Sequence, residues 1–322
     1  MIRTDLCELL GIDVPIIQAG MSVFTSAKLA AATSNAGGLG TLGGWRRQTD
    51  DLAREIEATR ELTDKPFAIN HLAPDLNDES FELTLASKPA VISLALGNPG
   101  DLVERAHEAG SLVLHQVTTV QQAVEAAERG VDVILAQGGE AGGYGGVIAT
   151  MPLIPQVVDA VAPIPVVASG GIADGRGIAD ALVMGASGVN IGTRFLASLE
   201  APIDDAWKQL IASANSEDAV KFDALNDISP IPGTIGYGTS VRALRTQFID
   251  NWNQHREEAA RDAERLGGEL RAAGQAGQLH TLMPGAGQSA GLIHSVLPVS
   301  EIMRRLVAEA DAAISRISKA HH

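Results

Sequence analysis

From the N-terminus to about residue 200, short β-rich runs alternate with alanine-rich helical segments, and this alternation constrains the fold more than any other feature. The runs lack the in-and-out alternation of a half-exposed sheet, which indicates strands that are buried on both faces. Eight evenly spaced strands predict an α/β fold, a (β/α)8 TIM barrel, and a doubly wound open sheet is the alternative. The candidate strands are residues 15–18, 39–42, 67–70, 91–94, 112–115, 131–136, 165–168 and 189–191.

Helical segments lie between these runs, and several end in a glycine that would cap the helix. The predicted helices are residues 26–36, 50–62, 79–86, 101–109, 120–129, 153–161 and 177–184.

The rhythm changes after residue 195, where mainly helical sequence follows, with a Pro/Gly interruption at 228–238. We predict a helix over 254–273 and a second, amphipathic helix over 299–317. The domain prediction is therefore a barrel over 1–200, an inserted helical cap over 201–285, and a returning segment with the last barrel helix over 286–320.

Composition limits the classes of function. The formal net charge of −15 disfavours nucleic acid as a partner, because phosphodiester binding needs a basic face. The chain has no signal-peptide pattern and no apolar run of membrane-spanning length, which predicts a cytoplasmic protein without a membrane partner. The single cysteine, Cys7, excludes an intramolecular disulfide, and its leucine-rich neighbourhood predicts a packed thiol.

Two strand ends about twenty residues apart have the character of a phosphate site. One runs through Ser169, Gly170 and Gly171, and the other through Gly192 and Thr193. Glycine lets the backbone approach an anion, and the N–H groups at a helix start point toward it. In a barrel, the last two loops of this kind lie side by side, so the pair predicts a phosphorylated cofactor.

The other strand ends are rich in glycine and amide side chains and poor in charge. They hold no carboxylate cluster or Cys/His set with metal spacing, so no metal site is predicted. Such a site suits a cofactor that brings its own reactivity. Residues 287–291 match the Gly-x-Ser-x-Gly pattern of hydrolases, but no β-rich run precedes them, which disfavours a nucleophilic serine.

Seven segments, in order along nearly the whole chain, share the pattern of one family: residues 15–21, 34–40, 65–70, 137–143, 168–175, 192–195 and 286–291. They resemble the nitronate monooxygenase (2-nitropropane dioxygenase) family of FMN-dependent barrels, which is related to the FMN-dependent enoyl-ACP reductases. Each segment is weak alone, and together they predict an FMN barrel; residues 200–280 carry little of the resemblance.

The resemblance implies how FMN would be held. The backbone of Ala19, Gly20 and Met21 would run under the isoalloxazine ring. Asn70 and Gln116 would hydrogen-bond the ring edge or the ribityl chain.

Two further groups complete the implied site. Gly142 and Gly143 would approach the ring face. Arg194 lies beside the phosphate loops in sequence, and the alternative is that it pairs with an acidic residue at the surface. The residues implied to hold the phosphate are Ser169, Gly170, Gly171, Gly192 and Thr193.

The chain departs from the family pattern at position 144. Where the family has Glu-x-Gly-Gly-His, this sequence reads Glu140-Ala141-Gly142-Gly143-Tyr144. The family histidine is the expected base or hydrogen-bond donor, whereas a phenol with an ordinary pKa near 10 is a poor base but a usable acid at neutral pH. Tyr144 is therefore the candidate catalytic residue, and removal of a proton from a neutral nitroalkane is disfavoured. The alternative is that Tyr144 only packs over the ring.

Other side chains are candidates for either a functional or a structural role. Gln288 and Ser289 are candidates for lining a substrate cavity, and Trp45 for walling the flavin or the substrate. We expect His115 to be structural and His71 to point away from its neighbour's face, because side chains alternate along a strand.

Three functions stay open. The principal prediction is an FMN oxidoreductase that resembles nitronate monooxygenase, oxidises a small-molecule nitronate and uses O2. The second keeps FMN and uses NAD(P)H to reduce an enoyl thioester or a quinone, although no clear nicotinamide site is visible. The third is a phosphate-ligand barrel without flavin. The sequence is also compatible with a homodimer.

Overall fold

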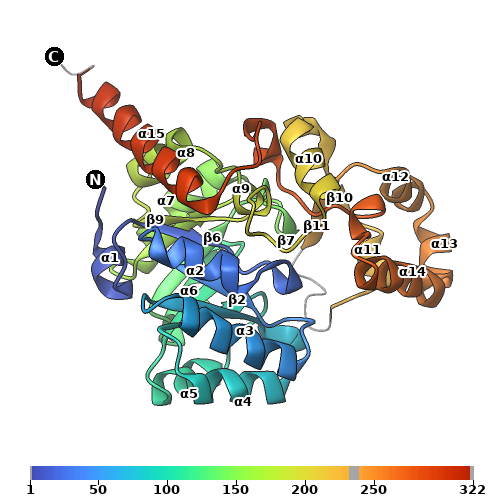
Figure 1. Cartoon of the computed structure of the whole chain (residues 1–322), viewed down its shortest axis with the longest axis horizontal. Coiled ribbons are helices and arrows are strands. Elements are labelled where there is room, and N and C mark those ends of the chain that lie inside the picture. The colour runs from blue at the N-terminus through green and yellow to red at the C-terminus, as the bar shows by residue number, and fades with distance from the viewer. Residues whose placement is uncertain (1, 232–238, 320–322) are drawn as a thin grey trace.

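The computed structural model describes residues 2–231 and 239–319, and its centre is a barrel of parallel strands (Figure 1). The strands are β1 (Ile16–Gln18), β2 (Gly40–Gly43), β3 (Phe67–Leu72), β4 (Val91–Ala95), β5 (Leu112–Val117), β6 (Val133–Gln137), β8 (Val166–Ser169) and β9 (Gly188–Ile191). They pair in the order β1–β9–β8–β6–β5–β4–β3–β2. A parallel bridge between Ile17 and Leu39 joins the two ends of this order. The predicted (β/α)8 barrel is confirmed, strand by strand.

The strands are buried on both faces, and one layer of the barrel interior is entirely apolar. Inward side chains such as Leu114 and Val167 form one cluster with Leu6 and Cys7 of helix α1 (Asp5–Leu10), which packs against the ends of the strands. Cys7 is fully buried there, as predicted. Burying each such leucine contributes roughly 2 kcal/mol to stability.

Helices cover the outside of the barrel, and four begin with a side chain that caps the helix: Ser26, Asn77, Thr119 and Asp174. Helix α15 packs against α8 and α2, and it confirms the amphipathic helix predicted over 299–317. The outer helices are α2 (Ala27–Asn35), α3 (Thr49–Leu62), α4 (Asp78–Ser87), α5 (Leu102–Glu108), α6 (Val120–Glu128), α7 (Thr150–Val161), α8 (Gly175–Val183) and α15 (Val299–Lys319).

A mainly helical region, which is called the cap from here on, lies beside the barrel (yellow to brown in Figure 1). The single helix predicted over 254–273 is wrong, because the backbone leaves the helical conformation at His255 and Asp262. These breaks let Ile249, Ala259 and Leu266 from three different helices reach one apolar cluster. The helices of this region are α10 (Asp205–Ser213), α11 (Leu225–Ile228), α12 (Gln247–Gln254), α13 (Arg256–Arg261) and α14 (Ala263–Gln275).

The cap also contains a small antiparallel sheet that was not predicted. Strands β10 (Ala219–Phe222) and β11 (Ser240–Leu244) pair with each other, and β11 pairs with β7 (Gly143–Gly145) from the glycine loop. The sheet therefore joins the cap to the barrel at Tyr144. The predicted interruption at 228–238 falls largely on residues 232–238, outside the described part of the chain.

Within the described residues, no helix combines the length and the apolar character that crossing a membrane would need.

Candidate functional site

A cavity of about 850 Å³ opens where the barrel strands end, between the barrel and the cap. All twelve residues predicted to hold the cofactor line this cavity, and so do Tyr144 and Ser289. Gln288 does not line it; its backbone N–H donates to the carbonyl oxygen of Glu140 at 2.9 Å. The twelve are Ala19, Gly20, Met21, Asn70, Gln116, Gly142, Gly143, Ser169, Gly170, Gly171, Gly192 and Thr193.

The loops after β8 and β9 form a backbone cradle. Gly170 and Gly171 have φ angles of +100° and +74°, which favour glycine. Within the described part of the chain, the backbone N–H groups of Gly170, Gly171 and Gly192 donate no hydrogen bond. A Cβ atom at position 170 would lie 3.0 Å from the carbonyl oxygen of Gly138. The cradle therefore offers free donors at close approach, which fits a phosphate dianion.

A row of amide side chains follows the strand ends around the cavity. Asn70 Nδ2 donates to Ser93 Oγ at 3.1 Å, and Gln116 Nε2 donates to Gln137 Oε1 at 2.8 Å. A Cβ atom at Gly20 would lie only 2.3 Å from the Cβ of Asn70, so only glycine lets this backbone pass. Neutral donors and acceptors beside an open backbone suit a ribityl chain and a polar ring edge.

The glycine loop over 138–146 is held by side chains on both sides. Thr150 Oγ1 lies 2.8 Å from Glu140 Oε2 and 3.1 Å from the carbonyl oxygen of Gly170, so it joins this loop to the cradle. From the cap, Arg242 donates to the carbonyl oxygen of Gly139 through Nε at 3.2 Å and Nη2 at 2.9 Å. Sequence reasoning did not find Thr150 or Arg242, because each acts on a carbonyl far away along the chain.

The sequence profile described as nitronate monooxygenase matches residues 3–80 and 75–309. The chain belongs to the nitronate monooxygenase family. The family's members are oxidoreductases, in general FMN-dependent, and this protein is a flavin-dependent enzyme. The residues around the cavity fit FMN, since the cradle, the amide row and the glycine loop match its phosphate, ribityl chain and ring.

Similar proteins differ in their reactions. The chain is 39% identical over 253 residues to the (3aS,4S,5R,7aS)-5-hydroxy-7a-methyl-1-oxo-octahydro-1H-indene-4-carboxyl-CoA dehydrogenase of Mycobacterium tuberculosis, covering 77% of this chain and 68% of that protein. It is 31% identical over 305 residues to a probable nitronate monooxygenase of Staphylococcus saprophyticus, covering 80% and 82%. The structure of FabK from Thermotoga maritima matches with a TM-score of 0.90 and 34% identity, covering 99% of this chain and 100% of that one.

Tyr144, for which the resemblance implies the position of a family histidine, lies on β7 at the cavity wall. Burial raises the pKa of its phenol to about 12, and the nearby positive charge of Arg46 offsets this only in part. Its ring meets that of Trp45 edge to face, with centroids 6.2 Å apart, and Trp45 Nε1 donates to Asp75 Oδ2 at 2.8 Å. Tyr144 is therefore a neutral phenol held in place, able to donate a proton and poorly able to accept one.

The charged side chains that line the cavity are both cationic. Arg46 comes from the loop after β2 and lies over the Trp45 ring, with its guanidinium carbon 4.3 Å from the ring centroid; Arg271 comes from α14 of the cap. The rest of the described lining is neutral, and much of it is apolar, including Leu72 and Leu270. Such a cavity favours an apolar ligand that carries an anionic group.

Two buried histidines lie outside this cavity. His71 Nε2 is 2.8 Å from Thr84 Oγ1, and His115 Nε2 is 3.1 Å from the carbonyl oxygen of Gly97. Burial lowers the pKa of each to about 4. Both therefore have structural positions, in agreement with the sequence-based expectation. In residues 2–231 and 239–319, no group of three or more His, Cys, Asp and Glu side chains is placed to hold a metal ion.

Proposed function

We propose that the protein is an FMN-dependent reductase of an α,β-unsaturated acyl thioester with a bulky apolar acyl group, and that NAD(P)H is its electron donor. The observation that carries this proposal is the neutral Tyr144 at the position of the family's histidine. Reduction of a carbon–carbon double bond needs a hydride at one carbon and a proton at the other. Bound FMN would supply the hydride.

Tyr144 would supply the proton that this reduction needs. Its phenol, with a pKa of about 12, stays protonated at neutral pH and can give its proton to the carbon next to the thioester carbonyl. The reverse reaction would need a base at the same place, which a buried phenol provides poorly. The contact with Trp45 holds the phenol at the cavity wall.

The lining of the cavity supports the choice of substrate. Leu72, Leu96 and Leu270 give apolar surface for an acyl group, while Arg46 and Arg271 are available for the phosphates of a thioester carrier. The similarity to a carboxyl-CoA dehydrogenase, at 39% identity, supports a CoA thioester in particular.

Oxidation of an alkyl nitronate with O2 is the second candidate. The family match favours it, and a nitronate arrives already deprotonated, so it needs no base at position 144. A neutral nitroalkane would need that base and is not proposed as a substrate.

An anaerobic half-reaction tests the proposal. The FMN-loaded enzyme is reduced with NADPH or NADH and mixed with cyclohexene carboxyl-CoA, and the return of the oxidised flavin absorbance is followed. We expect reoxidation in the wild type and a rate about 100-fold lower in Tyr144→Phe, since general acid catalysis contributes at least this much. Val147→Ala, at an exposed position close to Tyr144 in sequence that does not line the cavity, is the control and should stay within about twofold.

The opposite result identifies the second candidate. If the reduced enzyme is inert toward the thioester while propyl-2-nitronate bleaches the oxidised enzyme equally in wild type and Tyr144→Phe, the reductase proposal is wrong and nitronate oxidation takes its place.

A further inference from the structure

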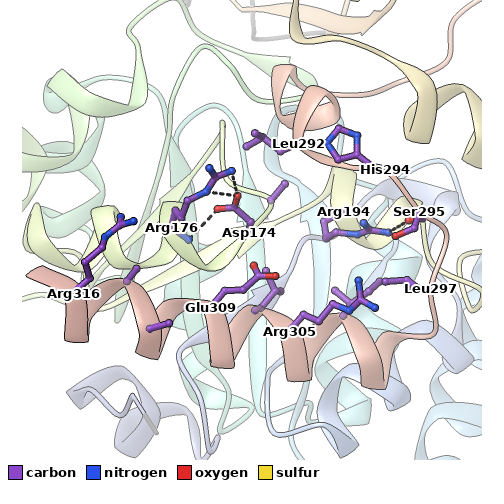
Figure 2. A pocket seen from close by; sticks show the side chains of 15 residues that line it. Asp174, Arg176, Arg194, Leu292, His294, Ser295, Leu297, Arg305, Glu309 and Arg316 are labelled. Carbon is purple, nitrogen blue, oxygen red and sulfur yellow. Dashed lines mark hydrogen bonds and ion pairs between the residues drawn. The ribbon is translucent and has the colours of Figure 1, made fainter.

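A second cavity, of about 660 Å³, lies outside the barrel between α15 and the segment that precedes it (Figure 2). One wall is α15, and the other is formed by the start of α8 and by residues 292–297. It shares no lining residue with the cavity of about 850 Å³ between the barrel and the cap, which is called the flavin cavity from here on. It nevertheless lies directly behind the backbone cradle. Thr193 and Ile172 line the first cavity, and the residues that follow them, Arg194 and Ala173, line the second.

Positive charge is in excess in this cavity, in a chain whose net charge is −15. Four arginines and two carboxylates line it, and both carboxylates are already engaged. Asp174 Oδ2 accepts from Arg176 Nε at 2.8 Å, and Glu309 Oε2 accepts from the backbone N–H of Gly175 at 3.0 Å. The remaining arginines are Arg194, Arg305 and Arg316.

Arg194 is the most informative of these residues. Its side chain is buried, with 7% of the residue exposed, and Nη2 donates to the carbonyl oxygens of Ala197 and Ser295 at 2.7 and 2.5 Å. Its Nε is buried without a hydrogen-bond partner among the described residues. This Nε is enclosed by protein and is not exposed in the cavity, so Arg194 contributes a positive charge close to the cavity wall that its two carbonyl partners compensate only in part.

Arg305 lies across the cavity from Arg194, on α15 (Figure 2). Burial, and to a smaller extent the charge of Arg305, lowers the pKa of Arg194 to about 10. Arg305 Nε donates to Glu301 Oε1 at 2.6 Å. Because Glu301 is shared with Arg304, it compensates the charge of Arg305 only in part. Two guanidinium groups that face one cavity are the arrangement that a carboxylate or phosphate stabilises.

We propose that this cavity is a second ligand site, which binds an anion with an apolar body. A carboxylate or phosphate head would lie between Arg194 and Arg305. The body would contact Leu297, Ile302 and Leu306, which give apolar surface on both walls. The volume suits a ligand of metabolite size. This site is independent of the reaction proposed for the flavin cavity.

Calorimetric titration of the FMN-loaded enzyme tests the site, with hexyl phosphate and hexanoate as probes and inorganic phosphate and hexanol as comparisons. We expect at least one amphipathic anion to bind about tenfold more tightly than either comparison compound, and the preferred head group distinguishes phosphate from carboxylate. An unchanged flavin spectrum shows that the flavin cavity is not the site that is titrated.

The chain offers a matched pair of variants. Arg304 and Arg305 are neighbours on α15 and both bond Glu301, but only Arg305 lines the cavity. Arg305→Ala should weaken binding at least tenfold, and Arg304→Ala less than about twofold. Ala312→Leu, which keeps every charge but narrows the cavity, should remove the advantage of hexyl phosphate over inorganic phosphate. Equal effects of the two arginine variants, or no binding of either amphipathic anion at millimolar concentration, would overturn the proposal.

Discussion

The two sides of the flavin cavity are built differently. On the barrel side, neighbouring parallel strands bring consecutive strand ends together, so that Gln137 pairs with Ser169 and Ser169 with Asn190. On the cap side, Tyr144 pairs with Val241, which is about a hundred residues later in the chain. The barrel side therefore follows from local sequence, whereas the cap side depends on contacts between distant segments.

This difference separates two tasks. The barrel side offers free backbone donors and needs glycine there, whereas the cap side offers side chains; under the proposed function the first would hold the phosphate and the second the substrate. Hydrogen bonds connect them, among them those of Thr150 toward the cradle and of Arg242 and Lys221 toward the glycine loop. If the two sides are energetically separate, cradle variants should lose FMN and cap variants should lose rate.

Gly170→Ala should have the largest effect. A Cβ atom there adds strain at a φ of +100°, roughly 1–2 kcal/mol, and approaches the carbonyl oxygen of Gly138. We expect the FMN dissociation constant, measured by flavin fluorescence, to rise about 100-fold as the loop relaxes away from the phosphate. Gly130→Ala has similar strain, with a φ of +82°, in open space and should leave FMN affinity unchanged. Equal losses in both variants would mean that the cradle has no special role.

Arg242→Met should have the next largest effect. It leaves the carbonyl oxygens of Gly139 and Ala219 without their donor, which costs about 1–3 kcal/mol locally and loosens β7. The rate that depends on Tyr144 should fall about tenfold in the anaerobic half-reaction, while FMN affinity stays within about threefold. Arg245→Met, which removes only an exposed ion pair with Asp250, is the control. A loss of FMN affinity as large as the loss of rate would contradict the separation of the two sides.

Thr150→Val sharpens the comparison, because Thr150 contacts both the glycine loop and the cradle. Losing its hydroxyl costs roughly 1 kcal/mol, so we expect FMN affinity and rate each to fall a few-fold. Thr84→Val removes a buried hydroxyl that bonds His71 and the carbonyl oxygen of Ser80, away from the cavity. That control should lower the midpoint of chemical denaturation and spare both other measurements.

The smallest effect is a pH dependence. The pKa of Tyr144 is raised from 10.0 to about 12, so between these values the folded protein keeps a proton that the unfolded chain releases. Stability should therefore fall as pH rises through this window, and proton donation should persist beyond pH 10. Because the chain has two tyrosines, tyrosinate absorbance of wild type minus Tyr144→Phe isolates this group. Ionisation near pH 10 would show that the phenol is not desolvated.

Sequence patterns predicted most of the barrel because its signals are local. Residues 91–94 and 166–168 are mainly apolar runs with turns at both ends, and Asp174 caps α8 where the chain leaves the cradle. The cap was less predictable. Strand β7 consists of Gly143, Tyr144 and Gly145, a composition that disfavours strands, and it forms only because β11 provides a partner.

The candidate site divides in the same way. The cradle glycines, Asn70 and Gln116 were predicted from their positions at strand ends and from the family resemblance, and all line the cavity. The neighbouring residues Gln288 and Ser289 could not be told apart by sequence, because a short 3-10 helix turns only Ser289 inward. Arg271 gave no signal, since it is one of many charged residues on an amphipathic segment.

By itself, the sequence determined the parallel barrel and the glycine-rich loops at its strand ends, and it predicted a phosphate there and Tyr144 in place of the family histidine. Each of these depends on residue types within a few positions of one another, through strand burial, helix capping or glycine conformation. The tertiary structure decided what surrounds Tyr144, which arginines face each cavity, and that a second cavity lies behind the cradle. Those properties depend on burial and on charge contacts between segments far apart in the chain, which exist only once the chain has folded.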